Sequence, residues 1–150
     1  MNYTIDASVF VAAARAEEKQ YAVSLAFLKQ AQEQGVDVFC PALVLPECSA
    51  AIARRTGLPA LAEKLVLLIE SFAGLRLIAL SLPLARRAAQ IAAAHRLRGA
   101  DSVYTAVAEE CAATLVTWDA EMLQRSSAVV PTITPTDWIA GQKAKMQATE

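Results

Sequence analysis

The stretch Asn2-Tyr3-Thr4-Ile5-Asp6-Ala7-Ser8 decides the fold, because it joins a strand to an acidic side chain directly after it. β-branched and aromatic residues favour an extended conformation up to Ile5, and the helix-favouring run Val9-Phe10-Val11-Ala12-Ala13-Ala14 follows. A strand that starts at residue 2 and presents Asp6 at its carboxyl end is well placed to be the middle of a parallel sheet. Ligands of open α/β sheets collect beyond this end of the strands. A functional site is therefore expected at Asp6.

Short β-branched runs alternate with longer helical segments along the rest of the chain. Further strands are predicted over 36–40, 75–80 and 114–117, with a fifth, edge strand over 129–133. Helices are predicted over 8–16, 21–34, 42–55, 59–73, 83–96, 101–112, 120–125 and 137–145. This alternation predicts an α/β fold in one domain spanning residues 1–150. We expect an α/β/α sandwich with a parallel sheet of four or five strands and helices on both faces.

The composition narrows the class of protein. The net charge is -1, so the overall charge does not indicate that the protein binds a polyanion. A local group of arginines can still bind one. The three cysteines, Cys40, Cys48 and Cys111, show no zinc-binding spacing, which favours reduced thiols in a cytoplasmic protein. We expect neither a secretory signal nor a transmembrane helix. In the helix that begins at Pro59, the residues Leu61, Leu65, Leu68 and Phe72 share one face, which we expect to be core or dimer surface.

Four acidic residues follow predicted strands or begin predicted helices: Asp6, Glu47, Asp101 and Asp119. Each one alone is explained by helix capping and by the helix dipole. Asp6, Glu47 and Asp119, however, share one end of the predicted sheet. Asp101 joins them if its helix also begins there.

The repulsion between clustered acids indicates what such a group would need. Two carboxylates about 4 Å apart repel by roughly 4 kcal/mol at an effective dielectric constant of about 20. Several such pairs would rival the stability of a whole domain, so the cluster requires protons, basic partners or a cation. An all-oxygen set of ligands suits Mg²⁺ or Mn²⁺, which also bind phosphate oxygens. The chemistry that follows is metal-assisted hydrolysis of a phosphodiester.

Four segments that carry these acids resemble the acidic motifs of PIN-domain ribonucleases, especially the VapC-like toxins of toxin-antitoxin pairs. They are Tyr3-Thr4-Ile5-Asp6-Ala7-Ser8-Val9-Phe10-Val11, Leu45-Pro46-Glu47-Cys48, Arg98-Gly99-Ala100-Asp101-Ser102-Val103-Tyr104 and Leu115-Val116-Thr117-Trp118-Asp119. The resemblance implies a parallel sheet of order 3-2-1-4-5. It also implies an endoribonuclease that uses Mg²⁺ or Mn²⁺, forms a homodimer and is silenced by a small antitoxin.

The resemblance assigns roles to individual residues. Asp6, Glu47, Asp101 and Asp119 would be the catalytic, metal-binding carboxylates, and Ser8 and Thr117 match positions where the family often has a supporting hydroxyl. Ala7 departs from the family pattern, which commonly has Thr or Ser there.

Other residues and other functions are left open by the sequence. Arg54, Arg55 and Arg98, with Arg86-Arg87 and Arg96, could bind RNA phosphates or form ordinary charged helix faces. Tyr104 and Trp118 could stack on bases, although packing is the simpler interpretation. A phosphatase with an aspartyl nucleophile at Asp6 is disfavoured, because Ser8 stands where such enzymes have a second acid. The alternative without catalysis is a PIN-like module that binds RNA or protein.

Overall fold

The computed structural model describes residues 1–149 and contains a five-stranded parallel sheet in the order β3-β2-β1-β4-β5. The strands are β1 (Asn2–Ile5), β2 (Asp37–Pro41), β3 (Leu75–Ile78), β4 (Thr114–Val116) and β5 (Thr132–Ile133). The helices are α1 (Ala7–Ala14), α2 (Tyr21–Glu33), α3 (Val44–Thr56), α4 (Pro59–Glu70), α5 (Leu82–His95), α6 (Gly99–Glu110), α7 (Ala120–Arg125) and α8 (Pro135–Gln147), with a 3₁₀ turn at Ser126–Ala128. The predicted fold and strand order are confirmed.

The position of β1 in the middle of the sheet sets where Asp6 lies. Tyr3 is in register with Val38 of β2 on one side and with Thr114 of β4 on the other. The ladder continues one residue past β1, where the Asp6 N–H donates to the Val116 carbonyl at 2.9 Å. Because all the strands are parallel, their carboxyl ends share the edge at which Asp6 stands.

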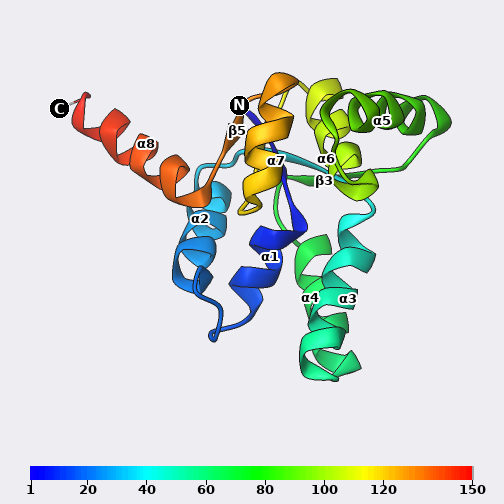
Figure 1. The fold of residues 1–150 in the computed structure, drawn as a ribbon. Coiled ribbons are helices and arrows are strands. Elements are labelled where there is room, and N and C mark those ends of the chain that lie inside the picture. Colours follow the sequence, from blue (N-terminus) through cyan, green and yellow to red (C-terminus); the bar gives the residue numbers. More distant parts are fainter. Residues whose placement is uncertain (150) are drawn as a thin grey trace.

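Successive side chains of a strand point to opposite faces of the sheet, and they pack into two hydrophobic cores, one on each face. In β2, Val38 and Cys40 belong to the larger core, with residues of α1 to α4, whereas Phe39 packs against the core formed with α5 and α6. Figure 1 shows α3 and α4 side by side as a projecting pair, and α8 extending away from the sheet. No helix within the described residues is long and apolar enough to cross a membrane.

The face expected to be core or dimer surface in the helix that begins at Pro59 is buried only in part. In α4, Leu65 is buried and Phe72 beyond its end is also buried, but Leu61 is 37% exposed and Leu68 is 57% exposed. The buried stripe of α4 instead consists of Ala62, Leu65 and Ile69. This stripe includes a small residue, Ala62, which a pattern of large leucines alone does not reveal.

Candidate functional site

Asp6 is held at the carboxyl end of β1 by a set of short polar contacts. It caps α1, with the Ser8 N–H donating to Oδ2 at 3.3 Å, and the Thr117 hydroxyl donates to the same oxygen at 3.0 Å. The side chain of Asp6 is thereby fixed in a residue that is only 6% exposed. Thr117 follows β4, so the parallel pairing of β1 with β4 brings together two residues that are far apart in the chain.

The two hydroxyls expected to support the site lie against each other beside Asp6. Ser8 Oγ and Thr117 Oγ1 are 3.5 Å apart. Ser8 Oγ accepts from the Trp118 N–H at 3.1 Å, and Thr117 Oγ1 accepts from the Asp119 N–H at 3.0 Å. These bonds fix the backbone between β4 and α7, from which the side chain of Asp119 projects.

The other three acids stand at helix N-termini, as the sequence predicts. Glu47 lies in the first turn of α3 and Asp101 in the first turn of α6. Asp119 is the N-cap of α7, where its Oδ1 accepts from the Met122 N–H at 2.8 Å. Helix N-termini favour negative charge, which offsets part of the cost of placing several acids at one edge.

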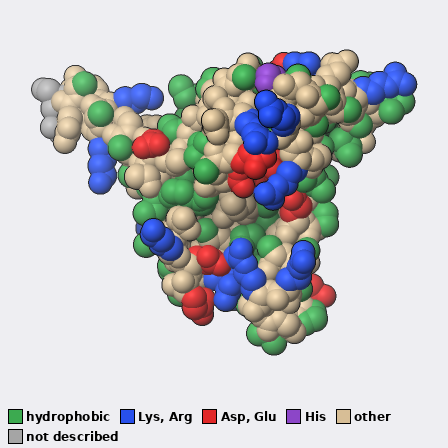
Figure 2. Space-filling model, viewed as in Figure 1, with side chains coloured by type: hydrophobic (Ala, Val, Ile, Leu, Met, Phe, Trp, Pro, Cys, Tyr) green, Lys and Arg blue, Asp and Glu red, His purple; other side chains and the backbone are tan. Residues whose placement is uncertain are grey.

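Asp6, Glu47 and Asp101 line one cleft of about 470 Å³, which we call the acidic cleft. Its wall also includes Glu18, Arg55, Arg98 and Trp118. Asp119 does not line this cleft, although its charge acts on Asp6 and Asp101. On the side of the molecule shown in Figure 2, acidic side chains lie between groups of basic ones.

Only some of the arginine and aromatic residues considered for RNA binding line the acidic cleft. Arg55 and Arg98 line the acidic cleft and Arg54 does not. Arg87 is engaged by Glu109, with contacts of 2.6 and 2.7 Å between α5 and α6. Tyr104 is fully buried, so packing is the correct interpretation of that residue, whereas Trp118 lines the cleft and donates from its indole to Ser24 Oγ at 2.8 Å.

Burial and mutual repulsion raise the pKa values of the acids in the cleft. Burial is the main cause for Asp6, with the charge of Asp119 adding to it and hydrogen bonds from Ser8 and Thr117 opposing it. The pKa of Asp101 rises to about 6, mainly through burial and then through Asp6, Asp119 and Glu47, against the opposing charge of Arg98. Each acid is therefore harder to ionise because the others are present.

Glu47 shows the same effect and also has an unsatisfied oxygen. Burial and the charge of Asp6 raise its pKa, and the nearby Tyr104 hydroxyl lowers it. Glu47 Oε1 and the Tyr104 hydroxyl are both buried, yet neither has a partner in hydrogen-bonding geometry among residues 1–149. A buried carboxylate oxygen without a partner is costly unless another group binds it.

These features fit a hydrated divalent cation better than a closed cage of ligands. Within the described part of the chain, no three acidic, histidine or cysteine side chains lie close enough together to bind one ion. Mg²⁺ normally keeps several waters and is held by one or two carboxylates, so it needs no such cage. An unpartnered Glu47 oxygen and acids with raised pKa values are groups that a hydrated cation would stabilise.

Glu18 in the wall of the cleft was not predicted from the sequence. Glu18 lies in the segment between α1 and α2, which the sequence marks only as a polar connection. Its partner in the cleft wall is Arg55 of α3, which is 37 residues away in the chain. A pairing over that separation leaves no local signal in the sequence.

Comparison with known proteins identifies what this architecture resembles. The sequence model of the PIN domain matches residues 3–127. No curated protein sequence matches the chain significantly. Among solved structures, PAE2754 from Pyrobaculum aerophilum is 21% identical with a TM-score of 0.70, covering 96% of each chain.

Two further structures have the same fold. VapC20 of Mycobacterium tuberculosis, described as a sarcin-ricin loop cleaving toxin, is 18% identical with a TM-score of 0.69, over 84% of this chain and 94% of that one. A chain of VapBC2 from Rickettsia felis, bound to a DNA fragment from its promoter, is 14% identical with a TM-score of 0.69, over 89% of this chain and 98% of that one.

Proposed function

Because this chain belongs to the PIN domain family, we propose that it is a divalent-metal-dependent endoribonuclease and the toxin of a type II toxin-antitoxin pair. The observation that carries the proposal is the acidic cleft, which Asp6, Glu47 and Asp101 line at the carboxyl edge of the sheet with raised pKa values. A cation would stabilise the ionised acids of this cleft and would in turn attract phosphate oxygens.

Asp6, Glu47, Asp101 and Asp119 are the proposed catalytic and metal-binding residues, with Ser8 and Thr117 in support. A bound Mg²⁺ or Mn²⁺ would supply a more acidic water and would neutralise charge on the phosphodiester. Thr117 and Ser8 orient Asp6 through the hydrogen bonds described above. Asp101 would hold the ion together with these residues, because a cation would offset the burial and the acidic neighbours that raise the pKa of Asp101 to about 6.

The proposed partners are RNA, a small cognate antitoxin and a second copy of the chain. The reported action of VapC20 on the sarcin-ricin loop and the VapBC2 complex support a toxin with RNA as its substrate. Arg55 and Arg98 at the cleft are the candidate phosphate contacts, whereas Arg54 lies outside the cleft wall and is not among them. An apolar groove between α1, α2 and α4, together with exposed leucines such as Leu80 and Leu82, offers surface for protein partners. We place the protein in the cytoplasm, where its free thiols persist.

Cleavage of RNA by the purified protein tests the activity. We expect cleavage with Mg²⁺ or Mn²⁺, none with EDTA, and a loss of roughly 10²–10³-fold in Asp6→Asn and Asp101→Asn, because each removes a charge from the cleft. Asp37→Asn is the matched control, since Asp37 is a half-exposed acid that pairs with Arg76 on another part of the sheet. Full cleavage by folded Asp6→Asn protein would show that the activity comes from elsewhere.

The alternative is a PIN-like module that binds RNA or protein without catalysis. The lack of a preformed group of three ligands within residues 1–149 is the observation that favours it. Calorimetric titration with Mn²⁺ separates the two functions. Binding that disappears in Asp6→Asn and weakens in Asp119→Asn supports the nuclease, and no binding to the wild-type protein supports the module.

A further inference from the structure

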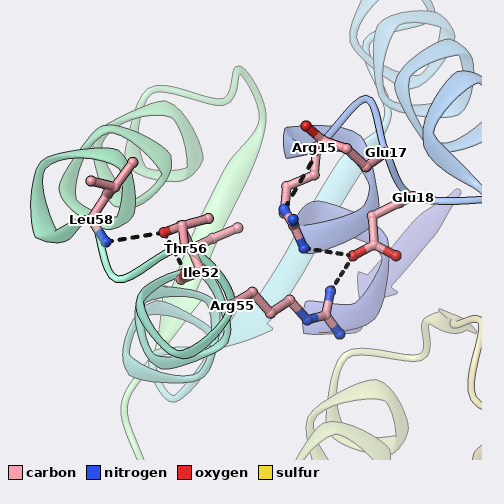
Figure 3. Close-up of polar contacts among 7 residues, drawn as sticks. All are labelled: Arg15, Glu17, Glu18, Ile52, Arg55, Thr56 and Leu58. Carbon is pink, nitrogen blue, oxygen red and sulfur yellow. Dashed lines mark hydrogen bonds and ion pairs between the residues drawn. The ribbon is translucent and has the colours of Figure 1, made fainter.

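Arg55 is held in place at the wall of the acidic cleft by a residue from another element. It lies in the last turn of α3, and its Nη1 donates to Glu18 Oε1 across the gap between α3 and the segment joining α1 to α2 (Figure 3). Arg15 Nη1 also donates to Glu18 Oε1, at 3.3 Å. Glu18 Oε1 thus accepts hydrogen bonds from two guanidinium groups, which orient its side chain. We call Arg15, Glu18 and Arg55 the arginine clamp.

The arrangement leaves part of the Arg55 guanidinium free to bind another group. Among the residues that the structure describes, Glu18 is the only hydrogen-bond partner of Arg55, and it uses Nη1 alone. The side chain of Arg55 is 47% exposed, whereas that of Glu18 is 25% exposed. A guanidinium binds phosphate best through two parallel N–H groups, and the Nε and Nη2 groups of Arg55 remain available.

The position of Arg55 along α3 indicates which phosphate it would contact. Arg55 and Glu47 are on the same helix, eight residues apart, which corresponds to about 12 Å along the axis. Among the described residues, the Arg55 guanidinium is bound to Glu18 and makes no hydrogen bond or ion pair with Glu47, so it is offset from the acids of the cleft. Arg55 is therefore placed for a phosphate that flanks the reacting one.

We propose that Arg55, oriented by Glu18, binds a backbone phosphate of RNA next to the reacting one and so determines how the strand enters the acidic cleft. This inference rests on the proposed ribonuclease function. Glu18 acts as a positioning residue, with Arg15 supporting it. Arg54, the neighbouring residue outside the cleft, has no such role.

Binding of fluorescein-labelled oligouridylate in EDTA, followed by anisotropy over a range of NaCl concentrations, tests the contact without cleavage. We expect Arg55→Ala to weaken binding by about tenfold, as for one lost charge-assisted contact. We also expect the salt dependence to become weaker. The slope of log affinity against log salt is negative, and its magnitude should decrease by about 0.7, as for one phosphate on a single strand. Arg54→Ala is the matched control, with the same charge change and little effect. Equal losses in the two variants, or no salt-sensitive binding by the wild-type protein, would overturn the proposal.

Variants of Glu18 test the positioning role, since they distinguish orientation from blockage. Removing an acid near RNA should strengthen binding through charge alone, as in the control Glu17→Ala. If Glu18 orients Arg55, then Glu18→Ala weakens binding by about threefold, the scale of an exposed ion pair, and Glu18→Gln, which keeps an accepting oxygen, weakens it less. In the Arg55→Ala background, Glu18→Ala should cause no further loss. Tighter binding by Glu18→Ala would show that Glu18 competes with phosphate, which contradicts the proposal.

Cleavage kinetics keep this inference separate from the proposed function. Arg55→Ala should raise KM and leave kcat within about twofold of the wild-type value, because uniform binding is lost and the chemistry is not. A fall in kcat at unchanged KM would overturn the role of Arg55 while leaving the nuclease intact. Absence of metal-dependent cleavage in the wild-type protein would instead reject the nuclease, and the binding results in EDTA would still decide whether Arg55 contacts RNA.

Discussion

At the scale of single residues, the acidic cleft contains side chains whose ionisation is opposed by their surroundings. Asp6, Glu47 and Asp101 all have raised pKa values, with burial as the main cause and neighbouring acids adding to it. Asp6 alone has two hydroxyl or amide donors that favour its ionised form. The protein without metal therefore stores unfavourable electrostatic energy at the site, which either protons or a cation can relieve.

This imbalance predicts how stability depends on pH. The pKa of Asp101 is raised from 3.8 to about 6 in the folded protein, so the folded state binds a proton more tightly than the unfolded state does. The resulting stabilisation is fully present below about pH 4 and is lost as the pH rises through about 6. We expect Asp101→Asn to remove this part of the pH dependence in thermal melts recorded in EDTA. Parallel curves for the variant and the wild-type protein would contradict the assignment.

Divalent cations should favour the ionised form of the carboxyl groups in the cleft, whereas their raised pKa values favour the protonated form. Mg²⁺ favours ionised carboxylates, so the increase in melting temperature that it causes should grow as the pH rises through about 6. Differential scanning fluorimetry with Mg²⁺ and with an equal ionic strength of NaCl measures the effect. A stabilisation that is the same at pH 5 and pH 7.5 would show that the acids of the cleft do not bind the ion.

At the scale of elements, the turns between helices and strands set the position of each strand end. Gly74 connects α4 to β3 with a φ of +82°, and a Cβ atom there would lie 2.7 Å from the Val36 carbonyl oxygen. Gly57 ends α3 with a φ of +67°, but a Cβ atom there would meet nothing within 4 Å. Both positions require the left-handed conformation, and only Gly74 is also crowded by backbone.

This difference predicts unequal effects of two similar substitutions. Gly57→Ala should cost about 1–2 kcal/mol of unfolding free energy, the strain of a left-handed Ala. Gly74→Ala should cost more, about 2–4 kcal/mol, because the backbone must also move away from the new methyl group. Urea denaturation gives both values. Equal losses would mean that the contact with Val36 relaxes without cost.

At the scale of the whole molecule, the segment that follows the part matched by the PIN domain model packs against the rest of the fold. The match ends at residue 127, and β5 and α8 follow. Trp138 of α8 is buried against Phe27 of α2, with ring centroids 5.0 Å apart, and against Tyr3 of β1 at 6.1 Å. The first turn of α8 is thereby packed against β1, the strand that Asp6 follows.

The packing of Trp138 predicts that α8 contributes much of the global stability. Trp138→Ala should lower the free energy of unfolding by about 3–5 kcal/mol, through lost burial and the cavity left behind. Met146→Ala, on the exposed end of the same helix, should change it by no more than about 0.5 kcal/mol. The two variants are compared by urea denaturation. Similar values for both would show that α8 does not stabilise the rest of the molecule.

The sequence by itself determined the sheet, its central strand and the four strand-end or helix-start acids. These features are local, because strand and helix propensity, turn residues and the position of an acid are each encoded within a few neighbouring residues. Asp6 after β1 and Glu47 in the first turn of α3 were predictable for this reason. The order of the strands came from the resemblance of the motifs rather than from any local pattern.

Only the tertiary structure decided which side chains share a space. It placed Asp119 beside the acidic cleft rather than in its wall, selected Arg55 over Arg54, and paired Arg55 with Glu18. It also exposed Leu61 and Leu68, whose spacing resembled that of a buried face. The physical reason is that each of these outcomes depends on how far one helix is rotated and shifted against another, and that packing is set by side chains distant in the chain.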